Sequence, residues 1–137
     1  MSSSSGLFVG LKGRAALVVG DEHTAVRVGS GGVTALATPV MVTLMEAAAV
    51  DAVADAMPDG QQSVGTRLDV DHRAATPLGM RVEAEAELVA VDGRTLTFRV
   101  VARDAVEIIG EGTHVRAVID TPRFDQRLAR KAAAPGA

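Results

Sequence analysis

The sequence contains no cysteine, tryptophan or tyrosine, and its aromatic side chains are three phenylalanines in 137 residues. Without cysteine the protein can form no disulfide, no thiol nucleophile and no cysteine-ligated metal site. So few aromatic rings argue against a nucleic-acid partner, because single strands are held by stacking their bases on such rings. No stretch approaches the roughly 18 consecutive apolar residues of a membrane span. We therefore expect an aliphatic core and a partner that is neither nucleic acid nor membrane.

The charge and the length indicate one ordinary domain. The formal charge is −3 at pH 7, which gives no general attraction to polyanions. The start of the chain, MSSSSGLFVGLKG, lacks the basic region and the apolar run of a secretory signal, so we expect a cytoplasmic protein. We predict a flexible N-terminus over residues 1–12, one folded domain over residues 13–122 and a basic C-terminal tail over residues 123–137.

One long helix is predicted in the segment TPVMVTLMEAAAVDAVADAM, with Thr38 as its N-cap and Pro39 at its first position. The stretch Pro58-Asp59-Gly60 ends it. At about 100° per residue, Glu46 falls in the apolar sector, together with Val42, Val50, Val53 and Met57. A carboxylate is thus expected where a structural helix would bury a methyl group, which makes Glu46 a candidate acid or base. An ion pair with an arginine such as Arg67 is the structural alternative.

The rest of the chain is typical of antiparallel strands. Residues 14–19 and 24–28 are short and β-branched, which indicates an opening strand or strand pair. From residue 63 the period changes to two, so His72 ends a strand on its core-facing side, in line with Val64, Thr66, Leu68 and Val70. Asp92-Gly93 predicts a two-residue hairpin. A last strand covers residues 107–119, where Gly110 and Gly112 allow a bulge or a close approach.

This order of elements predicts an α+β fold in which a curved antiparallel sheet of about five strands wraps a long central helix. Such a sheet has an open edge and an uncovered face. We therefore expect a homodimer or a higher homo-oligomer, with the active cleft near the subunit junction.

Three segments resemble the hotdog-fold thioesterase family that includes fluoroacetyl-CoA thioesterase: ATPVMVTLMEAAAVDA, SVGTRLDVDHRAATPLG and IGEGTHVRAVI. The resemblance extends over roughly residues 35–125. It implies a hotdog fold and an acyl-CoA thioesterase that hydrolyses a short or small acyl-CoA thioester. It implies a catalytic set of Thr38, Glu46 and His72, and substrate-binding roles for Gly65, His114 and Arg116. Coenzyme A is then part of the substrate, and no separate cofactor is implied.

The chemistry of thioester hydrolysis agrees with these residues. Glu46, desolvated in an apolar pocket, can act as base or nucleophile, His72 can donate a proton, and Thr38 can orient one of them. Covalent attack and direct attack by water both stay open. Each residue also has a structural alternative: His72 as a satisfied core histidine, Thr38 as an N-cap, Gly65 as a strand bulge, and Arg116 in an ion pair with a strand carboxylate.

The substrate is less well defined by the sequence. The segment before the helix, VRVGSGGVTALA, carries glycine and serine where the fluoroacetyl enzyme has phenylalanines, so we expect an open, mobile lid and weak discrimination of fluorine from hydrogen. Ala47 to Ala49 leave room for a larger acyl chain. The arginines and lysine of residues 123–131 form either a solvated face or a contact with the phosphates of coenzyme A.

Other activities find little support. The histidines, His23, His72 and His114, lack metal-ligand spacing, so no metal site is expected. The motifs of serine esterases and of nucleotide-binding loops are absent from the sequence. The alternative function is a noncatalytic hotdog module that binds an acyl or hydrophobic ligand. The residues do not decide whether the acyl carrier is coenzyme A or an acyl carrier protein.

Overall fold

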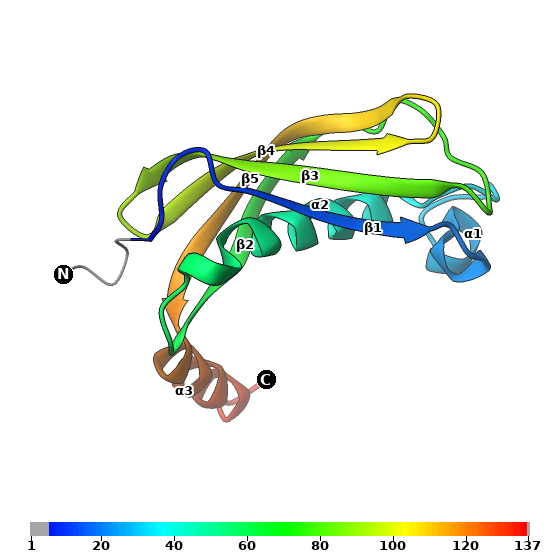
Figure 1. The fold of residues 1–137 in the computed structure, drawn as a ribbon. Coiled ribbons are helices and arrows are strands. Elements are labelled where there is room, and N and C mark those ends of the chain that lie inside the picture. The colour runs from blue at the N-terminus through cyan, green and yellow to red at the C-terminus, as the bar shows by residue number, and fades with distance from the viewer. Residues whose placement is uncertain (1–5, 137) are drawn as a thin grey trace.

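The computed structural model describes residues 6–136 of the chain, and Figure 1 shows their order of elements. The first strand is followed by a short 3-10 helix, a short α-helix and the long central helix, whose end tightens into a second 3-10 turn. Four further strands and a terminal helix complete the chain. The bounds are β1 Lys12–Val18, η1 Asp21–His23, α1 Ala25–Val28, α2 Thr38–Val53, η2 Ala54–Ala56, β2 Gln61–Val70, β3 Arg81–Asp92, β4 Thr95–Asp104, β5 Ile108–Asp120 and α3 Thr121–Ala132.

The five strands form one antiparallel sheet in the order β1-β3-β4-β5-β2. The sheet curves over α2, which lies along its concave side (Figure 1), so the predicted wrapped arrangement is confirmed. The hairpin expected at Asp92-Gly93 also forms. Its loop is Gly93 and Arg94, one residue later than predicted, because Asp92 still pairs with Thr95.

The core lies between α2 and the concave face of the sheet, and it is aliphatic as expected. Alternate residues of β3 and β4 point at the helix because successive side chains of a strand face opposite ways. The helix contributes Met41, Leu44, Met45, Ala48, Ala49, Ala52 and Val53, and these two strands contribute Val82, Ala84, Ala86, Leu88, Leu96, Phe98, Val100 and Ala102.

The second opening strand, predicted over residues 24–28, is wrong. Thr24 makes one isolated bridge, to Leu36, and its hydroxyl donates to the carbonyl of Asp21 at 2.8 Å. Residues 25–28 then form α1, which ends at Gly29 with a left-handed φ of 90°. Hydrogen bonds within this segment hold it in a helical turn, and they prevail over the strand propensity of its β-branched residues.

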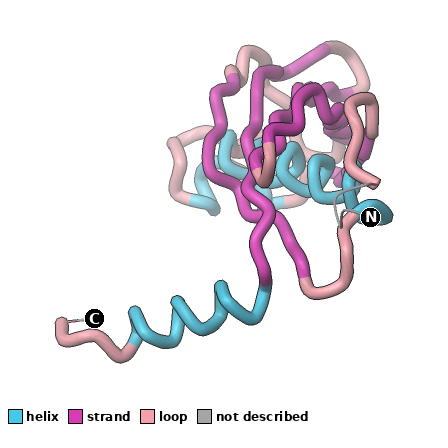
Figure 2. The backbone as a smooth tube through the Cα atoms, turned by 90° about the vertical axis from the view of Figure 1, so that its left-hand side faces the viewer, coloured by secondary structure: helices cyan, strands magenta, loops and turns pink. Residues whose placement is uncertain are grey.

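Both ends of the described chain have defined structure. Gly10 donates its backbone N–H to the carbonyl of Leu88 at 2.8 Å, just before β1 begins, whereas residues 1–5 lie outside the described part. At the other end, α3 projects from the ends of β2 and β5, away from the sheet (Figure 2), and none of its residues is buried. No helix within residues 6–136 is long and apolar enough to cross a membrane.

A close backbone approach between β1 and α2 holds the helix under the sheet. A Cβ added at Gly13 would overlap the backbone of Ala48 and Ala52 and would lie 2.7 Å from the Cα of Ala52. We expect Gly13→Ala to lower the free energy of unfolding by about 1–3 kcal/mol, because strand and helix must separate to admit the methyl group. Denaturant unfolding measures this loss.

The matched control is Gly32→Ala, since a Cβ at Gly32 meets nothing within 4 Å. This variant is expected to unfold at the wild-type denaturant concentration. Equal stability of the two variants would contradict the close approach.

Candidate functional site

Glu46 does not lie in the buried face of α2, and that prediction is wrong. The core-facing residues on either side of it in sequence are Met45 and Ala48, and its own side chain is 37% exposed. Val42 and Val50, which share its side of the helix, are half-buried and exposed, respectively. The helix is apolar almost all round, so its sequence offers two apolar stripes, and only the position of the sheet selects the buried one.

The partner of Glu46 is the buried side chain of Arg116. Its guanidinium donates from Nε to the hydroxyl of Ser63 at 2.8 Å and from NH2 to the carbonyl of Ser63 at 2.9 Å. Its NH1 lies 3.4 Å from Glu46 Oε2. Burial lowers the pKa of Arg116, and the negative charge of Glu46 opposes that change. The ion pair that was the structural alternative for Glu46 thus forms, with Arg116 and not with Arg67.

His114 is fully buried and holds the other side of this guanidinium. Its Nδ1 lies 2.8 Å from the carbonyl of Arg67, which can only accept, so Nδ1 carries the proton. Its Nε2 then accepts from NH1 of Arg116 at 3.0 Å. Burial lowers the pKa of His114; the Arg67 carbonyl opposes this, and the charge of Arg116 adds to it. His114 is therefore a neutral acceptor that orients Arg116.

Gly65 faces the Glu46 carboxylate across this cluster. A Cβ there would lie 2.7 Å from Glu46 Oε2 and 3.2 Å from Cε1 of His114. The pairing of β2 with β5 also shifts between Gly65 and Arg67, leaving Thr66 as an extra residue. Glycine thus leaves room for the carboxylate at the point where the strand bulges.

The bulge corrects the predicted alternation along β2. Residues that pair across a sheet share a face, and Gly65 pairs with Arg116 whereas Leu68 pairs with His114. The side chains facing the site therefore have odd numbers before the bulge and even numbers after it. The interpretation that residues 64–72 keep one core-facing set is wrong for this reason.

Thr38 and His72 form a second group. Thr38 Oγ1 and His72 Nδ1 are 2.7 Å apart. Thr38 is the first helical residue, and the N-cap is Ala37, which has no capping side chain, so the predicted capping role is wrong. His72 lies in the loop after β2, beyond its last residue, Val70.

The environment of His72 keeps it neutral. Burial lowers the pKa of its imidazole, against the opposing influence of the backbone at Ala74 and the charge of Asp71. Its Nε2 is buried and has no hydrogen-bond partner among the described residues. A neutral imidazole with one free nitrogen is available for a ligand.

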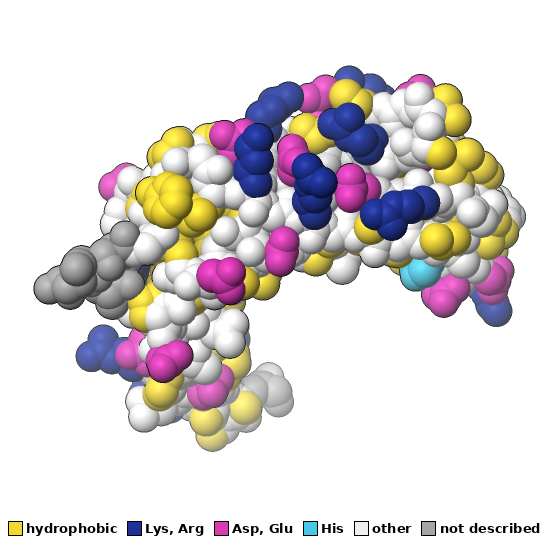
Figure 3. Space-filling view, in the orientation of Figure 1, with side chains coloured by type: hydrophobic (Ala, Val, Ile, Leu, Met, Phe, Trp, Pro, Cys, Tyr) yellow, Lys and Arg dark blue, Asp and Glu magenta, His cyan; other side chains and the backbone are white. Residues whose placement is uncertain are grey.

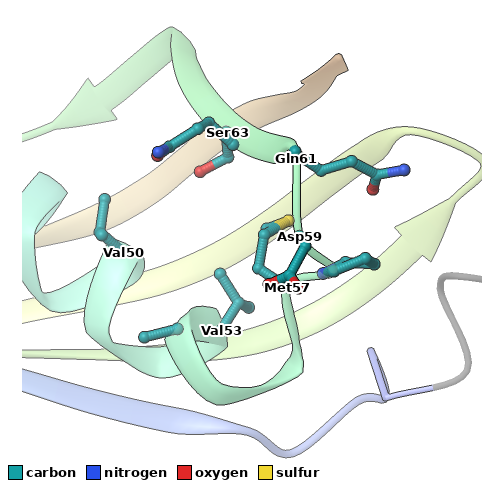
Figure 4. A pocket seen from close by; sticks show the side chains of 10 residues that line it. Val50, Val53, Met57, Asp59, Gln61 and Ser63 are labelled. Carbon is teal, nitrogen blue, oxygen red and sulfur yellow. The ribbon is translucent and has the colours of Figure 1, made fainter. Parts of the chain in front are cut away.

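Each group lies beside a cavity. The first cavity, of about 250 Å³, is bordered by Thr38 and His72 and by small residues of the preceding segment: Ser30, Gly31, Val33 and Ala35. The second, of about 350 Å³, lies one helical turn beyond Glu46. Three elements line this second cavity, as Figure 4 shows. Helix α2 supplies Val50 and Val53, the segment after it supplies Met57 and Asp59, and strand β2 supplies Gln61 and Ser63.

The structure brings the predicted residues together in two sets. Glu46, Gly65, His114 and Arg116 form one, and Thr38 and His72 form the other. Eight residues of helix separate Thr38 from Glu46, a rise of about 12 Å. Ser63 is the member that the sequence analysis missed, although its odd-numbered register with Gly65 could have identified it.

Solved structures share this architecture. A structure of the fluoroacetyl-CoA thioesterase FlK superposes with a TM-score of 0.87 at 39% identity, covering 93% of this chain and 98% of that one. A thioesterase superfamily member from Thermus thermophilus has a TM-score of 0.84 at 23% identity, covering 90% of this chain and 92% of that one, which shows the fold alone. The fold is that of the hotdog thioesterases.

Sequence comparison is more specific. The model of the fluoroacetyl-CoA-specific thioesterase family matches residues 19–122. The fluoroacetyl-CoA thioesterase of Streptantibioticus cattleyicolor is 48% identical over 95 residues, 69% of this chain and 68% of that protein. The chain belongs to the fluoroacetyl-CoA-specific thioesterase family, and it is a thioester hydrolase.

The two buried histidines predict how stability depends on pH. Both have a folded-state pKa below the ordinary 6.5, so each contributes stability that is complete above pH 6.5. As the pH falls below that value, the unfolded state binds protons that the folded state does not. We expect the free energy of unfolding to fall by up to about 1.4 kcal/mol per pH unit for each histidine.

Denaturant unfolding of the wild type and of His114→Gln between about pH 7 and pH 5.5 checks this expectation. The variant should lose roughly half of the slope, since His72 still titrates. An unchanged slope would show that folding does not lower the pKa of His114.

Proposed function

We propose that this protein hydrolyses the thioester of a short or small acyl-CoA, with Thr38, Glu46 and His72 as its catalytic residues. The observation that carries the proposal is the 2.7 Å contact between Thr38 Oγ1 and His72 Nδ1, which leaves the buried Nε2 free beside a cavity. The family membership supports the same reaction, since the named relatives act on fluoroacetyl-CoA.

Each residue has a defined part in the reaction. With the Thr38 hydroxyl donating to Nδ1, the imidazole proton sits on Nε2, where it can be donated to the oxygen or the sulfur of the thioester. Glu46 either attacks the carbonyl carbon or takes the proton of the attacking water; both routes yield the carboxylic acid and the free thiol. Arg116 holds Oε2 of Glu46, and Oε1 has no hydrogen bond within residues 6–136. All these groups come from the protein, so we expect no cofactor.

We propose that the working form is a homodimer whose site is shared between two copies. Within one copy, about 12 Å of helix rise separates Thr38 from Glu46, and their hydrogen bonds place Thr38 with His72 and Glu46 with Arg116 in two separate groups. The exposed side of α2 adjoins the edge strand β2, and both present apolar side chains, Val50 at 44% exposure and Leu68 at 36%. A second copy meeting this face would bring its own Glu46 toward Thr38 and His72 of the first.

Replacing the carboxylate separates catalysis from binding. Glu46→Gln keeps the shape of the side chain and removes its basicity, so kcat is expected to fall by about 10²–10⁴-fold while substrate still binds. Thiol release from acetyl-, fluoroacetyl- and medium-chain acyl-CoA esters measures turnover, and the best ester identifies the acyl group.

The control is Glu107→Gln, which changes an exposed carboxylate outside the site and should leave every rate unchanged. Full activity in Glu46→Gln would refute the catalytic role of Glu46.

Complementation tests the shared site. Glu46→Gln and His72→Ala are each expected to be inactive, but their mixed dimer would contain one complete site. Co-expression of the two with different tags should restore roughly a quarter of the wild-type activity if dimers assemble at random. An isolated mixed dimer with no activity would place the catalytic residues within a single chain.

The predicted cytoplasmic location stays a prediction.

A further inference from the structure

The C-terminal helix and the end of the sheet enclose a basic cleft outside both residue groups described above. Its volume is about 580 Å³, and its charged and polar lining consists of Arg94, Arg123, Gln126, Arg127, Arg130 and Asp120. Residues 117–119 of β5 form its floor. We call it the arginine cleft.

Two separate elements direct arginines into this cleft. Arg123, Arg127 and Arg130 follow each other at four and three residues along α3, a spacing that places them on one helical face. Arg94 comes from the β3–β4 turn, whose carbonyl at Arg94 accepts the N–H of Val118 at 2.8 Å. The convergence is therefore set by the tertiary structure as well as by the helical repeat.

The cleft concentrates positive charge that the protein does not neutralise. None of the four arginines belongs to an ion pair in the part of the chain that the structure describes. The carboxylate of Asp120 accepts the backbone N–H of Arg123 at 3.4 Å, as the N-cap of α3.

The outer face of the sheet is different. There Arg14 pairs with Glu85 at 3.2 Å and Arg81 with Glu83 at 3.3 Å, and Figure 3 shows basic and acidic side chains interspersed over that face. In a chain whose net charge is −3, four arginines without carboxylate partners in one hollow mark a site for an anion.

We propose that the arginine cleft binds the phosphate groups of the coenzyme A portion of the substrate. This inference rests on the proposed acyl-CoA hydrolysis. The cleft and the Glu46 group share the strand β5, because Ala117 in the floor of the cleft follows Arg116, although these two side chains face opposite sides of the sheet. Arginine forks match phosphate oxygens in pairs, and coenzyme A carries a diphosphate and a separate 3′-phosphate. A flexible pantetheine arm separates these phosphates from the thioester.

The test compares two esters of the same acyl group, one on coenzyme A and one on pantetheine, which has no phosphate. We expect Arg127→Ala to raise KM for the coenzyme A ester about tenfold, and Arg123→Ala combined with Arg127→Ala to raise it about a hundredfold, with kcat unchanged. KM for the pantetheine ester should stay at the wild-type value. Lys131→Ala, on the same helix but outside the cleft, is the matched control and should change neither constant.

A binding measurement keeps this inference separate from the proposed reaction. Adenosine 3′,5′-bisphosphate should bind the wild type, with an affinity that falls as salt rises, and should bind the double arginine variant at least tenfold more weakly. Inorganic phosphate at the same concentration should not compete.

The outcomes are distinct. Loss of bisphosphate binding in the variant supports the cleft even if no ester is hydrolysed, a result that would refute only the proposed reaction. Unchanged bisphosphate binding, or a KM that rises equally for both esters, would overturn the cleft. Competition by inorganic phosphate would show a general anion site in place of a coenzyme A site.

Discussion

The hydrogen bonds of the buried Arg116 guanidinium are the interaction on which the arrangement of β2, β5 and α2 around Glu46 depends. A charge removed from water is tolerated only when its donors are satisfied, and here Ser63, His114 and Glu46 satisfy them. The same bonds join β2, β5 and α2 at one point. Loss of any partner would leave a buried donor unpaired, so the position of Glu46 is coupled to the tautomer of His114 and to the register of β2.

The central helix α2 packs against the sheet with one side and carries candidate catalytic residues on the other side. The side facing the sheet is packed closely enough that Gly13 of β1 meets the helix backbone, and it fixes the axis of the helix. The other side carries Glu46 and, at its first turn, Thr38. Because the axis is fixed by packing on one side, the polar groups on the other side need only local partners, Arg116 for Glu46 and His72 for Thr38, to hold their positions.

The sequence predicted the general architecture well because strand alternation and helix periodicity are properties of neighbouring residues. The aliphatic core, the Asp92 hairpin and the last strand with its close glycine approaches all depended on such local patterns. The burial of Glu46, the capping role of Thr38 and the predicted inward face of Val64 and Thr66 did not follow, because each depends on where a distant segment packs. A single bulge at Thr66 was enough to reverse the alternation, so that odd-numbered residues face the site before it and even-numbered residues face the site only after it.

The segment from Gly29 to Val33 lies against the cavity beside Thr38 and His72 but makes no contribution to the core cluster. Added bulk at Gly32 would meet no neighbouring atom within 4 Å. Residues 30–33 can therefore be exchanged at little cost to folding, whereas the left-handed φ of 90° at Gly29 favours glycine. The scaffold therefore allows the shape of this cavity to change while the groups on α2 and the sheet keep their positions.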